Sequence, residues 1–252
     1  MPVRSAAEPP TKERRSPRRR AAVVGVGISA GLGYFGIKIA VGLLAASVVG
    51  AVASSLFGGP WERLPSDTRS QLERRLEAAL GDSIKGLSDA DASARVDAAV
   101  TAGQARLDDP TLVRRFRLLT AAVASADGTT CAAFARADVA GHKLDPVIAQ
   151  KLIDSLDTAR LSEWFEINVE AIEAQQRGAP ATRSVPLEAS QAMFIALDAR
   201  VSASDTATLI GLANGTPESD AAACAAERSF YVAGLQLDPT NLAVLALSGV
   251  AP

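Results

Sequence analysis

The longest apolar run in the chain lies near its N-terminus. Residues 39–57 are 19 consecutive residues without a charged side chain, inside an apolar segment that covers residues 21–57. About 20 apolar helical residues cross the hydrocarbon core of a bilayer. The pattern therefore predicts a single transmembrane helix over about residues 38–57. Lys38 then lies at the membrane boundary, where its long side chain can reach the headgroups.

The glycine-rich start of this segment has an alternative interpretation. Residues 25–30, GVGISA, fit the G-x-G-x-x-G/A pattern of dinucleotide-binding folds. That pattern requires an acidic residue about 20 positions further on and a helix with a polar face. The next acidic residue after Glu13 is Glu62, and Lys38 is the only charge between residues 23 and 57. We therefore favour the membrane interpretation and expect no cofactor.

Charge is distributed very unevenly on the two sides of the apolar run. Residues 1–20 carry seven basic and two acidic side chains, a net charge of +5, whereas the chain after residue 38 carries 18 basic and 26 acidic ones, a net charge of −8. Basic segments stay on the cytoplasmic side of a membrane. We expect residues 1–20 to be a disordered cytoplasmic tail. Residues 58–252 are expected in the periplasm or outside the cell, beyond a bacterial-type inner membrane.

The lipid bilayer is thus one expected partner, and for the basic tail we favour a role as a topology signal over nucleic-acid or lipid-headgroup binding. Cleavage remains an alternative to anchoring, because Ala51 and Ala53 form the small-x-small pattern of a signal-peptidase site. The long N-terminal lead and the length of the apolar run favour a retained anchor, since signal-peptide cores usually have about 7–15 apolar residues. Whether the segment is cleaved after Ala53 stays open.

Small residues recur every fourth position along the predicted membrane helix. They are Gly42, Ala46, Gly50 and Ser54. Such a stripe lets two membrane helices approach closely, so it is a candidate surface for a homo-oligomer. A helix rich in alanine and glycine also produces such a stripe by chance, and the sequence does not separate the two explanations.

After residue 58 the pattern is helical throughout, and no run alternates with period two for long enough to indicate a strand. Apolar residues follow helical spacing at Leu72, Leu76 and Leu80, with an N-cap expected at Ser66 or Asp67. Further helices are expected over residues 89–107 and 110–126, over a segment that ends at Gly178, and from Pro186 through Met193 and Leu197. The long segment before Gly178 has an apolar face formed by Leu161, Phe165, Val169 and Ile172. The pattern predicts an all-α bundle of eight to ten helices.

Two stretches of this region align with each other without a gap. The segments that begin at Cys131 and Cys224, 93 residues apart, share ten of 22 residues, including Cys-Ala-Ala, Val-Ala-Gly and Leu-Asp-Pro. Alanine content alone does not produce matching Cys, Gly, Asp and Pro residues at fixed spacing. We infer a bundle built from two duplicated halves, over about residues 60–157 and 158–252.

The repeated segment has a local structural interpretation. Asp127 and Asp220 are expected to cap a helix, Gly141 and Gly234 to end it, and Leu-Asp-Pro to begin the next helix. The second copy, YVAGLQLDPTNLAVLALSG, resembles the junction between the two helices of a tetratricopeptide repeat. The resemblance covers 19 residues and has no 34-residue period behind it, so it implies only two packed antiparallel helices.

Cys131 and Cys224 are the only cysteines, and both fall in the predicted exported part. Disulfides persist in oxidising compartments. We predict a structural disulfide between them; two buried free thiols are the alternative. A thiol near a helix N-terminus also has a lowered pKa, which suits redox chemistry, but the chain has no C-x-x-C motif.

Few residues suggest catalysis. His142 is the only histidine, and it falls in an expected loop. A row of glutamates, Glu163, Glu166, Glu170 and Glu173, could supply a carboxylate pair for glycoside cleavage, but such a row is usually the solvated side of a helix. The RRFR run at residues 114–117 has the same interpretation. We therefore favour a non-enzymatic envelope protein that binds a protein partner or acts as a scaffold, with no catalytic, cofactor or metal site. The alternative is an envelope hydrolase or thiol-redox protein.

Overall fold

The computed structural model describes residues 59–141, 144–178, 180 and 183–250, and this part of the chain contains ten labelled α-helices and no strand. The all-α prediction is confirmed. The basic tail, the predicted membrane helix and its small-residue stripe lie outside the described residues. None of the described helices is both long enough and apolar enough to span a bilayer.

The helices follow one another through short connections. They are α3 (Ser66–Ile84), α4 (Asp89–Gln104), α5 (Asp109–Ser125), α6 (Gly128–Val139), α7 (Pro146–Asp154), α8 (Thr158–Arg177), α9 (Leu187–Asp198), α10 (Ala203–Ala213), α11 (Asp220–Leu235) and α12 (Pro239–Ser248).

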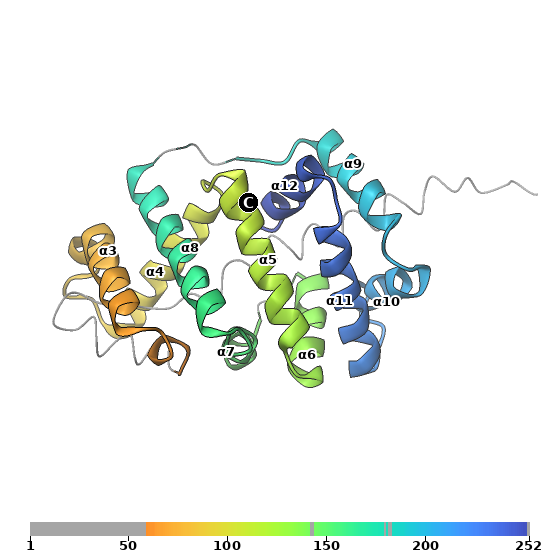
Figure 1. Cartoon of the computed structure of the whole chain (residues 1–252), viewed down its shortest axis with the longest axis horizontal. Helices are drawn as coiled ribbons and strands as arrows, with labels where there is room; N and C mark the ends of the chain where they lie inside the picture. Colours follow the sequence, from red (N-terminus) through yellow and green to blue (C-terminus); the bar gives the residue numbers. More distant parts are fainter. Residues whose placement is uncertain (1–58, 142–143, 179, 181–182, 251–252) are drawn as a thin grey trace, which may run out of the picture.

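Helix α5 runs through the middle of the molecule (Figure 1). On one side of it, α8 packs along α4 and α3; on the other side, α11 packs between α6 and α10, and α12 packs on α9. Because α5 contacts α8 as well as α11 and α12, it joins the two groups of helices. Their buried apolar residues form one continuous core.

Aspartate side chains begin many of the helices. Asp108, Asp127 and Asp157 each accept a hydrogen bond from the backbone N–H three residues further on. Asp145 and Asp238 do the same for α7 and α12, where proline occupies the first turn. These side chains satisfy N–H groups that have no partner inside the helix.

Three local expectations are wrong. Helix α3 begins after Pro65 with no side-chain cap from Ser66 or Asp67. Helix α11 is capped by Ser219, which places Asp220 in the first turn instead of at the cap. Gly234 lies inside α11 and does not end it.

The reason for glycine at position 234 is close packing. A Cβ there would lie 2.7 Å from Cζ of Phe116 and 2.8 Å from Cδ2 of Leu245. Helix α11 therefore approaches both α5 and α12 at this residue. Gly141, by contrast, follows α6 with a φ of 63°, and Gly178 ends α8 with a φ of 66°, the left-handed conformation that glycine adopts without strain.

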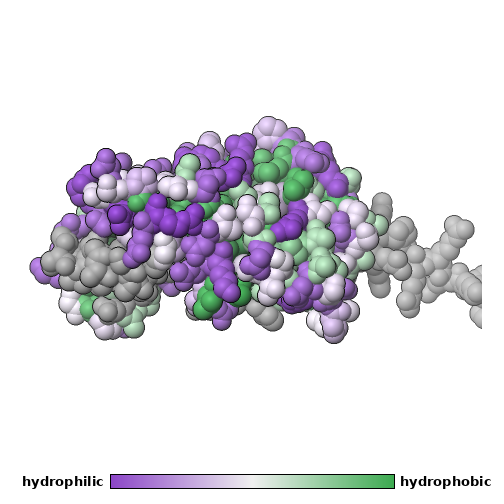
Figure 2. Space-filling view, turned by 60° about the horizontal axis from the view of Figure 1, so that its bottom comes forward, coloured by the Kyte–Doolittle hydropathy of each residue, from purple (hydrophilic) through white to green (hydrophobic). Residues whose placement is uncertain are grey.

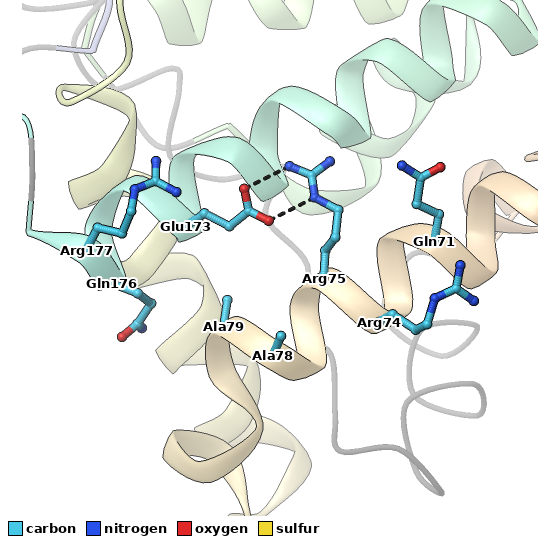
Figure 3. A pocket seen from close by; sticks show the side chains of 8 residues that line it. All are labelled: Gln71, Arg74, Arg75, Ala78, Ala79, Glu173, Gln176 and Arg177. Carbon is cyan, nitrogen blue, oxygen red and sulfur yellow. Dashed lines mark hydrogen bonds and ion pairs between the residues drawn. The ribbon is translucent and has the colours of Figure 1, made fainter.

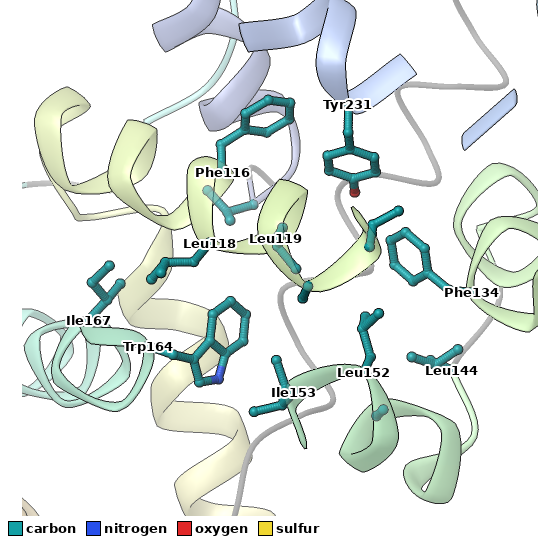
Figure 4. Packing of buried hydrophobic residues seen from close by; sticks show 14 of the residues in the cluster. Phe116, Leu118, Leu119, Phe134, Leu144, Leu152, Ile153, Trp164, Ile167 and Tyr231 are labelled. Atoms are coloured by element: carbon teal, nitrogen blue, oxygen red, sulfur yellow. The ribbon is translucent and has the colours of Figure 1, made fainter. Parts of the chain in front are cut away.

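The apolar faces predicted from the sequence are buried. Leu72, Leu76 and Leu80 of α3 lie in the core, as do the predicted faces of α8 and α9. Figure 4 shows the centre of this core, where Leu119 of α5 lies between Trp164 of α8 and Phe134 of α6. On the outside, the face in Figure 2 is mostly hydrophilic, with small hydrophobic patches.

Candidate functional site

Cys131 of α6 and Cys224 of α11 form a disulfide, with their Cα atoms 5.2 Å apart. The predicted pairing is confirmed. The two cysteines are 0% and 4% exposed, so the disulfide is shielded from solvent. It covalently joins two helices that are far apart in the sequence and packed along each other.

Beyond the disulfide, the same two helices meet through the residues three and seven positions after each cysteine. These are Phe134 and Asp138 in α6, and Glu227 and Tyr231 in α11. The Phe134 and Tyr231 rings lie 5.8 Å apart between centroids, and the Asp138 and Glu227 carboxyls lie close enough to shift each other's pKa. Since later residues of α6 meet later residues of α11, the helices run in the same general direction along their interface.

This interface contains a cluster of buried ionisable groups, which we call the buried charge cluster. Its members are Arg115, Asp138, Glu227 and Tyr231, each 4% exposed or less. Asp138 interacts with the side chains of Glu227 and Tyr231 and with the charge of Arg115. Figure 4 shows the Tyr231 hydroxyl pointing into the interior, and the ring stacks on Phe116 at a centroid distance of 5.2 Å. Such groups are rarely buried unless they are paired.

The burial of Arg115 corrects the expectation that the whole RRFR run lies on the surface. Its guanidinium Cζ lies 5.5 Å from the centre of the Trp164 ring, a cation–π contact that partly replaces water. Burial lowers the pKa of Arg115 to about 10, and the charges of Tyr231 and Asp138 oppose this decrease. Arg115 is therefore still a cation at neutral pH.

The two carboxyl groups behave differently from ordinary surface acids. Burial raises the pKa of Asp138 from 3.8 to about 7, although Glu227, Arg115 and Tyr231 favour its ionised form. Burial and the neighbouring Asp138 raise the pKa of Glu227 well above its usual range. Burial therefore favours the protonated form of both carboxyls, which lie near the Arg115 cation.

The glutamate row of α8 has a structural role in this fold. Glu173 forms a bidentate ion pair with Arg75 of α3, with both N–O distances 2.8 Å, and Glu163 pairs with Arg114 of α5 at 2.9 Å. Hydrogen bonding to Arg75 lowers the pKa of Glu173, whereas burial raises the pKa of Glu170. All four glutamates are partly exposed, so the row borders solvent, and Glu163 and Glu173 also pair with arginines of neighbouring helices.

An open groove lies beside the Arg75–Glu173 ion pair, between α3 and α8 (Figure 3). Its volume is about 520 Å³. Ala78 and Ala79 lie along one part of it, and Arg74 and Arg177 lie toward opposite ends. The groove contains no combination of nucleophile, base and oxyanion donor among its lining residues.

The structure does not place the remaining candidates from the sequence. His142 lies outside the described residues, as do Gly42, Ala46, Gly50 and Ser54. In the described part of the chain, no three His, Cys, Asp or Glu side chains are grouped so that they could hold a metal ion. Comparison of the chain with protein-family models, curated proteins and solved structures finds no match.

Proposed function

We propose that the protein is a single-pass envelope protein in which residues 38–57 anchor an exported, disulfide-bonded helical domain that binds a protein partner or acts as a scaffold. The uncharged run of residues 39–57 supports the anchor. The net charge of +5 before it and of −8 after it supports a cytoplasmic N-terminus and an exported C-terminal domain.

The disulfide is the observation that carries this proposal. A bond between Cys131 and Cys224 persists in an oxidising compartment and is reduced in the cytosol of most bacteria. Its burial favours a structural role over thiol exchange, because an attacking thiolate must reach a sulfur atom. The ion pairs of Glu163 and Glu173 likewise favour a structural role for the glutamate row over hydrolysis.

We also propose that the domain arose from two duplicated halves. Five helices in each half correspond in order when the chain is shifted by about 93 residues. The paired helices begin at residues 66 and 158, 89 and 187, 109 and 203, 128 and 220, and 146 and 239. The correspondence extends well beyond the 22 residues that align in sequence.

The α6–α11 interface supports the same idea, because its contacts are reciprocal. Phe134 and Glu227 occupy equivalent positions three residues after the cysteines, and Asp138 and Tyr231 occupy equivalent positions seven residues after them. Phe134 contacts Tyr231, and Glu227 contacts Asp138. An approximate two-fold axis through the disulfide would produce this arrangement.

Protease protection tests the proposed topology. The full-length protein, tagged at either end, is treated with protease in intact spheroplasts and after lysis. We expect the C-terminal tag to be lost in both samples and the N-terminal tag only after lysis. The proposal would be contradicted by a C-terminal tag that stays protected in spheroplasts whose other outer-surface proteins are digested. The mass of the mature protein shows separately whether the chain is cleaved after Ala53.

Cross-linking in native membranes tests the interaction role. The most exposed large apolar side chains of the described helices are Leu187 and Ile195, each 72% exposed, in α9. Gln191 is an exposed position between them, so a photo-cross-linker there samples this face. One discrete cross-linked product is expected. If no cross-linked product forms from position 191 or from other exposed positions, the protein has no stable partner.

Gly50→Ile should weaken self-association if the small-residue stripe packs one membrane helix on another.

A further inference from the structure

The residues just before α3 are packed onto the rest of the domain. Residues 59–62 form one helical turn, and Trp61 within it is only 1% exposed. Its ring meets the ring of Phe165 in α8 edge to face, with the two centroids 5.2 Å apart. Leu64, which follows the turn, is also buried. Residues 59–64 are therefore part of the folded core.

Arg63 attaches the same segment to the turn between α7 and α8. Its Nη1 donates a hydrogen bond to the backbone carbonyl of Asp154 at 2.7 Å, and its Nη2 donates to the backbone carbonyl of Leu156. Carbonyl groups at the end of a helix lack partners within the helix and attract a cation. Figure 1 shows residues 59–64 at the same edge of the molecule as α7 and the start of α8. The segment is thus fixed at this edge through Trp61 and Arg63.

The short stretch of chain before Trp61 limits how far this edge can lie from a bilayer. This step rests on the proposed anchor, whose uncharged run ends at residue 57. A fully extended chain covers at most about 14 Å between residues 57 and 61. The headgroup layer on each side of the hydrocarbon core is about 5–8 Å thick. Trp61 and the side chains packed on it therefore lie less than about 10 Å beyond the headgroups.

We propose that the domain rests on the lipid headgroups through one defined surface, formed by Glu62, Arg63 and residues 154–158, which we call the membrane-facing surface. The exposed side chains of this surface are polar, so they suit contact with hydrated headgroups and not insertion into hydrocarbon. The contacts of Trp61 and Arg63 hold this orientation, because they leave only residue 58 between the proposed anchor and the folded segment.

This orientation turns the exposed apolar residues of α9 away from the bilayer. Helix α8 starts at the membrane-facing surface, and its 20 residues span about 30 Å. Figure 1 shows the end of α8 and the start of α9 at the opposite edge of the molecule. Leu187 and Ile195 are therefore accessible to a partner beyond the membrane surface and are not buried in lipid.

Fluorescence quenching in the full-length protein, reconstituted into phosphatidylcholine liposomes, tests this orientation. A fluorophore is attached to Thr158→Cys on the membrane-facing surface or to Gln191→Cys on α9, and the native cysteines stay unlabelled in their buried disulfide. A lipid with a nitroxide headgroup, present in both leaflets, acts as quencher whichever way the protein inserts. We expect at least about twofold quenching at position 158 and little at position 191, because about 30 Å of α8 separates the two edges.

Two variants test whether the contacts of residues 59–64 hold the orientation. An insertion of about ten Gly and Ser residues between Gly58 and Gly59 spans about 18 Å on average and should abolish the difference between the two positions. Arg63→Ala removes the hydrogen bonds to the carbonyls of Asp154 and Leu156 and should reduce the difference. Arg74→Ala, which removes an exposed arginine of α3, is the matched control and should keep the wild-type pattern.

Flotation of the same liposomes separates this inference from the proposed anchor. Protein that floats with the liposomes but is quenched equally at both positions, or more strongly at position 191, overturns the orientation alone. So does an insertion or Arg63→Ala variant that keeps the wild-type difference. Protein that does not float with the liposomes contradicts the anchor, and the membrane-facing surface with it.

Discussion

Gly103 shows, at the scale of a single residue, how closely α4 approaches α8. A Cβ at this position would lie 1.8 Å from the carbonyl oxygen of Ala171, which is a backbone atom and cannot turn aside. We expect Gly103→Ala to force the two helices apart and lower the free energy of unfolding by about 3 kcal/mol or more. Denaturant unfolding measures this change.

Gly81 provides the matched control, because it lies inside α3 and a Cβ there meets only Cγ of Glu77 at 3.6 Å. Gly81→Ala should increase the free energy of unfolding by about 0.5–1 kcal/mol, since alanine loses less backbone entropy in a helix than glycine. Equal effects of the two substitutions would contradict the close α4–α8 contact.

The sequence contained a signal for the buried charge cluster, although helical periodicity did not reveal it. Asp138 and Glu227 lie seven and three positions after the two cysteines, so each shares a helix face with a cysteine. If the cysteines meet in the core, these carboxyls must lie near them. The burial of Arg115 had no comparable signal in the sequence. Its neighbours Arg114 and Arg117 are the same residue type and are not buried, and only the packing of Arg115 against Trp164 in the folded protein sets it apart from them.

At the scale of one element, Asp108 determines how the central helix α5 begins. Its carboxylate accepts a hydrogen bond from the backbone N–H of Thr111. We expect Asp108→Ala to lower the free energy of unfolding by about 1 kcal/mol, as for other lost N-caps, and Asp108→Asn to change it little. If both substitutions were equally destabilising, the capping role would be wrong.

The stabilisation that Asp108 contributes should also depend on pH. Its direction is opposite to that expected for Asp138 and Glu227, whose pKa values are raised by burial. Interactions with Thr111 lower the pKa of Asp108. The contribution of Asp108 is therefore present above its unfolded pKa and is lost as the pH falls through its folded pKa. Thermal unfolding below pH 4 should accordingly be less pH-dependent in Asp108→Asn than in the wild-type protein.

Helix positions could be predicted well from the chain because apolar spacing, proline and glycine mark them locally. Pro110, Pro146 and Pro239 all fall in the first turn of a helix, and Gly178 ends α8. Caps were less predictable, since Ser219 and Asp220 are both good N-caps and differ by one position. Gly234 was misassigned because close helix packing and helix termination both favour glycine.

For the molecule as a whole, the disulfide is the strongest single constraint on the unfolded chain. It joins residues 93 positions apart, and closing such a loop stabilises a fold by about 2–5 kcal/mol. We expect the Cys131→Ser, Cys224→Ser double variant to lose stability in that range. Denaturant unfolding with and without reductant checks this.

Reductant provides the internal control for that comparison. It should lower the unfolding midpoint of the wild-type protein toward that of the double variant and leave the variant unchanged. Because both sulfurs are buried, reduction should also be slow until the domain unfolds. Rapid reduction of the folded protein would contradict a shielded disulfide.

Most of the helices could be predicted from apolar spacing, but their packing could not. Helix α8 packs on α3 and α4, whereas its proposed counterpart α3 packs on α8 and α4. The two proposed halves therefore contact one another extensively and do not form separate lobes. Which helices meet depends on complementary side-chain surfaces that a 22-residue alignment does not contain.

The thiol state of the full-length protein in intact bacterial cells tests the proposed compartment most directly. Cells are quenched with acid, free thiols are alkylated with a mass tag, and the sample is compared with one that is reduced first. No tagged cysteine is expected before reduction and two are expected afterwards, because the proposed location outside the cytoplasm would preserve the disulfide between Cys131 and Cys224. Two tagged cysteines before reduction would contradict it.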